Sequence, residues 1–143
     1  DTITFTKKQP MPQTIDLSNC PDLGPILCVL ASYTNGETNI VNAARLRMKE
    51  SDRIEAMETE LKKWGVAITS TFDSIQIHGK EQYKSNNTIE IFGHNDHRIV
   101  MAMTVFGLCA DSECIIDDAQ AITKSYPTFF EDIQSLGGKV EIL

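Results

Sequence analysis

The apolar positions in the first half of the chain alternate between helical and extended spacing. Residues 22–33 place leucine, isoleucine and aromatic side chains at helical spacing, which predicts a buried helix. The short apolar centre of residues 37–43 is typical of a strand. A second helix is expected to follow, with Ser51 or Asp52 as its cap. Residues 66–79 then predict two strands joined by a turn, and therefore a hairpin.

The second half of the chain repeats this order. Residues 88–93 predict a strand, and a helix that is apolar on nearly every side is expected to begin after Asp96. A short strand over 113–117 comes next. A helix over 127–136 is indicated by a proline, which suits a first helical turn, and by apolar residues at helical spacing. Residues 139–143 predict a closing strand.

The two halves can be interpreted as copies of one unit. Asp22 and Asp96 each precede a buried helix, and each helix is followed by a strand, a second helix and another strand. We interpret residues 1–143 as a single partial domain with an internal repeat, approximately 15–80 and 88–143, and an extra hairpin in the first copy. Two such units predict an α/β domain in which mixed outer sheets cover buried helices.

Composition agrees with one domain and excludes some classes of function. The chain has 143 residues, of which 41% are hydrophobic, so it can bury a core of ordinary size. Its net charge of −7 argues against nucleic-acid binding, since such proteins normally carry a basic surface. An anionic small molecule stays compatible with this charge, because a local basic cluster can exist on an acidic protein.

The sequence also predicts a cytoplasmic protein. It has no run of about 18 apolar residues, which a membrane-spanning helix needs, and its first ten residues do not resemble a signal peptide. The four cysteines, at positions 20, 28, 109 and 114, form no CxxC pair. Because Cys28 and Cys109 lie within apolar helical runs, we expect reduced thiols in the core.

Polar residues gather at the points where the chain enters its helices. These points are Asp22, the KESDR segment at 49–53, the HNDHR segment at 94–98, and Lys124 ahead of the last helix. A helix N-terminus offers free backbone N–H groups and the positive end of the helix dipole, which favour a phosphate or a carboxylate. The pattern therefore predicts an anion site assembled from several helix starts.

Individual residues in these segments have distinct chemical uses. Arg53 and Arg98 can hold an oxyanion through two hydrogen bonds each, whereas Lys49 and Lys124 supply point charges. Acids beside such cations have altered pKa values and suit proton transfer. The candidate proton carriers are Asp22 and Glu50.

Simpler interpretations remain open at this point. Asp22 and Asp96 can be helix caps, and residues 49–53 can be a charged cap with weak helical ion pairs. His94, Asp96 and His97 have a spacing found in metal sites, although no third strong ligand accompanies the histidines. A stand-alone anion-binding or metal-binding module without catalysis is thus the alternative to an enzyme.

Three segments, in order, resemble one known family. RMKESDRIEAMETEL, NDHRIVMAM and TKSYPTFFEDI are similar to the C-terminal part of the 5-enolpyruvylshikimate-3-phosphate synthases, which are enolpyruvyl transferases, and IDLSNCPDLGPILCVLASYTNGET also fits. The resemblance covers almost the whole chain. It implies repeated βαβαββ units with helices inside and mixed sheets outside, the inside-out α/β barrel, of which about two units of one domain are present.

The resemblance also implies a reaction. The family transfers the enolpyruvyl group of phosphoenolpyruvate to the 5-hydroxyl of shikimate 3-phosphate in chorismate and aromatic amino acid biosynthesis, and needs no metal or other cofactor. By this resemblance, phosphoenolpyruvate, or glyphosate in its place, is bound by Arg53, Arg98 and Lys124. His97 is expected beside that pocket.

Further roles follow from the same resemblance. Asp22 and Lys49 are expected to contact the shikimate unit, with Asp22 at the reacting hydroxyl, and Glu50 to move protons at the methylene carbon. Arg45 stands where some members carry a substrate-binding asparagine, so we leave it out of the site. Because the other domain of these longer enzymes supplies most shikimate-phosphate contacts, we expect this chain to be inactive without that N-terminal domain as its partner.

Overall fold

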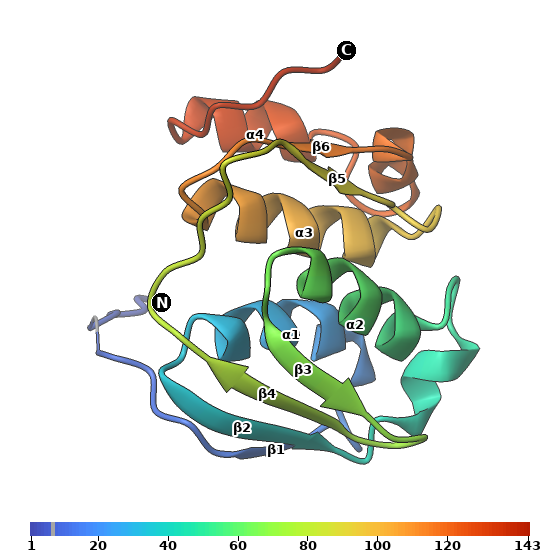
Figure 1. The fold of residues 1–143 in the computed structure, drawn as a ribbon. Helices are drawn as coiled ribbons and strands as arrows, with labels where there is room; N and C mark the ends of the chain where they lie inside the picture. Colours follow the sequence, from blue (N-terminus) through green and yellow to red (C-terminus); the bar gives the residue numbers. More distant parts are fainter. Residues whose placement is uncertain (7) are drawn as a thin grey trace.

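The computed structural model describes residues 1–6 and 8–143, and its central helices lie between two sheets (Figure 1). The first half contains β1 (Thr14–Asp16), α1 (Gly24–Ser32), β2 (Gly36–Val41), α2 (Arg53–Lys63), β3 (Ala67–Ser70) and β4 (Ile75–Gly79). The second half contains β5 (Ile89–Ile91), α3 (His97–Cys109), β6 (Cys114–Ile116) and α4 (Phe129–Ser135). Short 3-10 helices span Pro21–Leu23, Ala44–Met48 and Ala119–Lys124.

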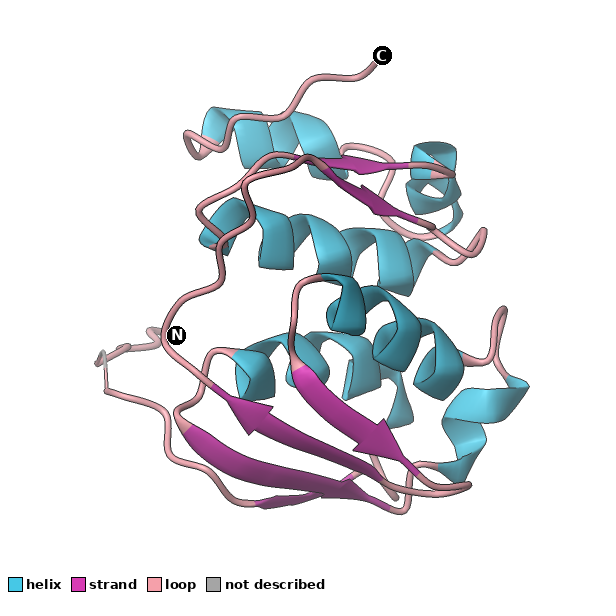
Figure 2. Cartoon of the chain, viewed as in Figure 1, coloured by secondary structure: helices cyan, strands magenta, loops and turns pink. Residues whose placement is uncertain are grey.

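The larger sheet has the strand order β1-β2-β4-β3. β1 is parallel to β2, whereas β4 is antiparallel to both β2 and β3, so β3 and β4 form the expected hairpin. The smaller sheet pairs β5 with β6 in parallel. Helices α1 and α2 lie on one face of the larger sheet, and α3 lies between them and the smaller sheet (Figure 2). This arrangement confirms an α/β fold with helices inside and sheets outside.

The ends of α2 and α3 follow from local sequence. The Asp52 carboxylate accepts a hydrogen bond from the Glu55 amide at 3.1 Å and caps α2, while Asp96 caps α3 by accepting from the Arg98 amide. The chain leaves α2 at Gly65, whose φ of 74° is a left-handed conformation that glycine adopts without strain. Both caps therefore place charged residues at the entrance to a buried helix.

One apolar core joins the two halves of the chain. Trp64, at the end of α2, and Phe106 of α3 have ring centroids 5.2 Å apart, and Tyr33 and Tyr83 pack on the same Phe106 ring. Phe106 is fully buried. A smaller cluster packs α3 against the 3-10 helix before α4 and against α4 itself. This packing fixes the C-terminal ends of α1, α2 and α3 relative to one another.

The strand predicted over 139–143 is wrong, since these residues form neither a strand nor a helix. In the first half, the corresponding strand β3 pairs only with β4. Within the described residues, 139–143 pairs with no strand of either sheet. Leu136, at the end of the predicted helix, is also 84% exposed.

Two predictions of burial are correct only in part. Cys28 is fully buried, but Cys109, the last residue of α3, is exposed; all four cysteines are free. Helix α1 buries one side, while Leu23, Ile26 and Leu30 leave 39–50% of their surface exposed on the other. Within the described part of the chain, every helix is too short or too polar to span a bilayer.

Candidate active site

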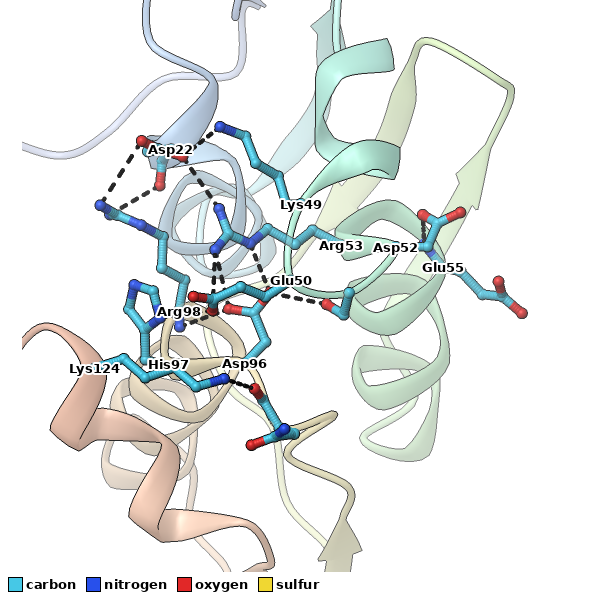
Figure 3. A network of polar contacts seen from close by, with 12 residues as sticks. Asp22, Lys49, Glu50, Asp52, Arg53, Glu55, Asp96, His97, Arg98 and Lys124 are labelled. Atoms are coloured by element: carbon cyan, nitrogen blue, oxygen red, sulfur yellow. Dashed lines mark hydrogen bonds and ion pairs between the residues drawn. The ribbon is translucent and has the colours of Figure 1, made fainter.

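Arg53 is the centre of the polar network that connects three helix starts (Figure 3). As the first residue of α2 it is only 2% exposed. Its Nε and Nη2 atoms donate to the two carboxylate oxygens of Asp96 at 2.8 and 3.1 Å, which is a bidentate pair. Its Nη1 atom donates to Asp22 at 3.2 Å. One buried guanidinium thus connects the segment before α1 with the starts of α2 and α3.

Asp96 is fully buried and has donors on both oxygens. Besides the two bonds from Arg53, Oδ2 accepts from the Ser51 hydroxyl at 2.9 Å and Oδ1 from the Arg98 amide at 3.0 Å. These four donors use the acceptor capacity of a carboxylate. Burial alone would raise the pKa of Asp96, but the hydrogen bonds and charge of Arg53, together with the hydrogen bonds from the Arg98 amide and Ser51, outweigh it and leave this pKa below its ordinary value. Asp96 is therefore an ionised anchor as well as a helix cap.

Three cationic side chains contact the carboxylate of Asp22. Its carboxylate lies 3.0 Å from Lys49 Nζ, 3.2 Å from Arg53 Nη1 and 3.9 Å from Arg98 Nη2. The hydrogen bond from Lys49, with the charges of Lys49, Arg98 and Arg53, holds the pKa of Asp22 below its ordinary value despite partial burial. Asp22 makes no side-chain capping bond, so the interpretation as a simple helix cap is wrong for it.

Glu50 and His97 form a second acid–base pair beside Arg53. The Nδ1 atom of His97 lies 2.7 Å from Glu50 Oε2, and the same oxygen lies 3.8 Å from Arg53 Nη2. The two atoms share one hydrogen, because either an imidazole N–H donates to the carboxylate or a protonated carboxyl group donates to Nδ1. Glu50 is partly exposed, whereas His97 is nearly buried. The pair can pass a proton between the interior and an exposed carboxylate.

Arg98 and Lys124 are the more accessible cations. Arg98 donates through Nη1 to the backbone oxygen of Asp22 at 3.1 Å, and Lys124 donates to the backbone oxygen of Asn95 at 2.6 Å. Both oxygens belong to segments that also carry network residues. The structure therefore brings all seven residues predicted for the site into one region (Figure 3): Asp22, Lys49, Glu50, Arg53, His97, Arg98 and Lys124.

The predicted metal set of His94, Asp96 and His97 is not formed. The Nε2 atom of His94 contacts Glu60 Oε1 at 3.1 Å instead. Ligand atoms of Glu50, Asp96 and His97 do lie within 4.8 Å of one another. A cation does not fit there, because Asp96 already accepts four hydrogen bonds and the positive charge of Arg53 lies beside it. The geometry does not favour the metal-binding alternative.

Sequence reasoning missed the main partner of one acid in this region and did not single out another. Asp96 was expected as a cap or a metal ligand, yet its main partner is Arg53, 43 residues earlier in the chain. Glu60 was not singled out, although it is a buried carboxylate on α2 that contacts His94. The one available signal for Glu60 was its position among the apolar residues of the predicted helix. That position does not identify His94 as the partner of Glu60.

A family model decides the relationship of this chain to known proteins. The model described as EPSP synthase (3-phosphoshikimate 1-carboxyvinyltransferase) matches residues 1–133. The chain belongs to the EPSP synthase family. Enzymes named 3-phosphoshikimate 1-carboxyvinyltransferase from Clostridium kluyveri and Clostridium acetobutylicum are 46% and 48% identical to it, over 89% and 88% of the chain. The chain spans 29% of the length of each of these relatives.

Solved structures agree with the EPSP synthase fold. The EPSP synthase from Acinetobacter baumannii matches with a TM-score of 0.79 and 34% identity, over 87% of this chain and 29% of that one. The enolpyruvyl transferase NikO from Streptomyces tendae matches with a TM-score of 0.76, over 95% of this chain and 30% of that one. Because NikO is only 18% identical, it supports the shared fold alone.

Proposed function

We propose that this chain forms part of a 3-phosphoshikimate 1-carboxyvinyltransferase. The observation that carries the proposal is the contact of Arg53 with both Asp22 and Asp96, because it joins three of the four family-like segments in one cationic site. Membership of the EPSP synthase family supports the reaction class. In that reaction the enolpyruvyl group of phosphoenolpyruvate moves to the 5-hydroxyl of shikimate 3-phosphate, and phosphate leaves.

Phosphoenolpyruvate is the proposed ligand of Arg53, Arg98 and Lys124. Arg98 and Lys124 are accessible and suit its phosphate and carboxylate groups. Arg53 has most of its donors engaged by acids, so it reaches the ligand through Nη1, which it now directs at Asp22. Glyphosate, which carries a phosphonate in place of the phosphate and also has a carboxylate, is proposed to compete for the same cations.

Two acids are proposed to move protons. Asp22, whose pKa is lowered chiefly by Lys49, is ionised at neutral pH and accepts the proton of the attacking hydroxyl. That oxygen bonds to the central carbon of the enolpyruvyl group while Glu50, aided by His97, supplies a proton to the methylene carbon. The methylene carbon is then a methyl group, which returns one proton to Glu50 as the C–O bond to phosphate breaks, and the departing phosphate takes the proton held by Asp22. Lys49 is proposed to hold the shikimate unit beside Asp22.

The internal repeat, the need for an N-terminal domain and the cytoplasmic location are also part of the proposal. Residues 15–80 and 88–143 are two repeats of one partial domain, and an N-terminal domain supplies the remaining contacts, so this chain alone is inactive. Four free cysteines agree with a cytoplasmic enzyme.

A chimeric enzyme tests the function. The 127 matched residues of the Clostridium kluyveri relative are replaced by this chain, and phosphate release from phosphoenolpyruvate is followed with shikimate 3-phosphate present. We expect turnover by the chimera, its loss in Glu50→Gln, and none by the 143-residue chain alone. The control is Glu58→Gln, since Glu58 pairs with Lys62 on the outer side of α2. Turnover that survives Glu50→Gln, or turnover by the chain alone, would contradict the proposal.

A further inference from the structure

Glu60 is a buried carboxylate that connects α2 to the turn between β5 and α3. It is 1% exposed, and its Oε2 atom accepts the Phe92 amide at 3.0 Å. Its Oε1 atom lies 3.1 Å from Nε2 of His94, and Lys63 Nζ lies 2.7 Å from Oε2. Because the Phe92 amide and Lys63 both donate to Oε2, Glu60 acts as an acceptor, and we assign the hydrogen of the third contact to Nε2 of His94. One side chain of α2 therefore holds both a backbone amide and an imidazole of this turn.

Two further carboxylates hold the turn from its opposite side. The Gly93 amide donates to Asp117 Oδ1 at 2.6 Å, and the Asn95 amide donates to Asp118 Oδ2 at 2.9 Å. Both aspartates follow β6. Hydrogen bonds from buried or half-buried amides to carboxylates are stronger than those to neutral acceptors. The turn over 92–95 is thus fixed by acids from two separate elements.

The backbone of this turn needs such support. His94 and Asn95 have φ angles of 54° and 47°, a left-handed conformation that non-glycine residues adopt rarely. A conformation of this kind persists when the surrounding contacts over-determine it. The contact of Glu60 with the His94 ring restrains the first of the two residues directly.

The turn and the residue after it provide two groups that bind side chains of the active site. The backbone oxygen of Asn95 accepts the bond from Lys124, and Asp96, the next residue, holds Arg53. We propose that Glu60 is a positioning residue: through His94 and the 92–95 turn it sets the places of Asp96 and Lys124, and so of the guanidinium of Arg53. The consequence for ligand binding rests on the proposed function, whereas the consequence for geometry does not.

The test compares Glu60→Ala and Glu60→Gln in the 143-residue chain labelled with 15N. In Glu60→Ala we expect hydrogen exchange of the Phe92 amide to quicken about tenfold, as befits one lost hydrogen bond. We expect the Arg53 Nε–H and Arg98 amide resonances to shift, and affinity for phosphoenolpyruvate to fall about three- to tenfold. In Glu60→Gln the amide group donates to His94, so the imidazole hydrogen moves from Nε2 to Nδ1, and the Arg53 and Arg98 resonances return toward their original positions.

Glu58→Ala is the matched control, because Glu58 lies on the same helix and pairs with Lys62 and Ser70 rather than with the turn. It is expected to leave the Arg53, Arg98 and His94 resonances unchanged. The proposal is overturned if Glu60→Ala lowers stability without moving the Arg53 Nε–H resonance. If Glu60→Ala does not fold, an unchanged His94 tautomer in Glu60→Gln overturns it instead. These spectroscopic outcomes need no ligand, so they stay valid if the chimera shows no turnover and the proposed function fails.

Discussion

At the scale of single residues, the site is built around a buried positive charge. Removing an arginine from water is costly, and a bidentate carboxylate with additional hydrogen bonds offsets that cost. Asp96 supplies this carboxylate to Arg53, while Asp22 and Glu50 approach the same guanidinium from more exposed positions. The arrangement keeps Arg53 fixed and charged, which a site for an anionic ligand requires.

Asp96→Asn is expected to lower the free energy of unfolding by about 3–5 kcal/mol, because it leaves Arg53 buried without its main counter-charge. Urea denaturation followed by tryptophan fluorescence measures this change, since Trp64 lies in the core. Asp111→Asn is the control, because Asp111 makes an exposed pair with Lys84. A loss of similar size in both variants would show that the Arg53 contact is not the cause.

The acid dependence of stability follows from the lowered pKa of Asp96. Its folded pKa lies below the ordinary value of 3.8, so the folded state favours the ionised form. This contribution is complete above the unfolded pKa and is lost as the pH falls through the folded pKa. The free energy of unfolding is therefore expected to fall below about pH 4, and to fall less steeply in Asp96→Asn. Parallel curves for the two proteins would contradict this assignment.

Asp22 acts as an internal anion for the cations of the site. It contacts Lys49, Arg53 and Arg98, so an anionic ligand must displace a carboxylate already present. Asp22→Asn is expected to strengthen phosphoenolpyruvate binding up to about fivefold, the equivalent of exposed pairs worth at most about 1 kcal/mol. The same change is expected to abolish turnover in the chimera. NMR titration measures the affinity, and weaker binding in Asp22→Asn would show that Asp22 does not compete with the ligand.

At the scale of elements, the first turn of α2 presents Arg53 to the site. The Asp52 cap holds this turn, and Arg47 fixes Asp52 in place through a 2.7 Å ion pair while it also donates to the backbone of the β3–β4 hairpin at Phe72. The hairpin therefore supports the start of α2. Fraying of that turn would move Arg53 relative to Asp96.

Asp52→Ala is expected to cost about 1 kcal/mol through the lost cap, with a small further loss from the ion pair with Arg47. Hydrogen exchange of the Glu55 amide is expected to quicken more than exchange in the middle of α2. Urea denaturation measures the total loss in the free energy of unfolding. Glu55→Gln is the control, because Glu55 contributes only its backbone amide to the cap. Equal exchange at Glu55 in both variants would contradict the role of Asp52.

Elements were predicted well from sequence where their signals are local. The caps Asp52 and Asp96 are confirmed, since a cap contacts residues only two or three positions away. The strand over 139–143 was wrong because strand formation needs a partner that apolar spacing alone does not reveal. The residue types of the site were predicted from the motifs, but the pairing of Arg53 with Asp96 is a tertiary contact that spacing cannot specify.

At the scale of the whole molecule, the Arg53 network joins three helix starts from both halves of the chain, yet the resulting site is open to water. Asp22 leaves half of its side chain exposed, and Lys124 is exposed as well. The net charge of −7 adds long-range repulsion of an anionic ligand. Although the cations are brought together correctly, they are therefore expected to bind an anionic ligand only weakly in this chain.

Binding of phosphoenolpyruvate to the 143-residue chain is expected to be millimolar or weaker. Arg98 and Lys124 offer exposed pairs worth about 0–1 kcal/mol each, and most donors of the buried Arg53 already bond to Asp96 and Asp22, against an association cost of at least about 4 kcal/mol. Added salt is expected to weaken binding further, because exposed charges are screened beyond roughly 10 Å at 0.1 M. Resonances of all three residues are expected to shift together during an NMR titration, and those of the distant Lys84 to stay fixed. Micromolar affinity in high salt, or shifts confined to one of the three cations, would show that they do not form a single open anion site.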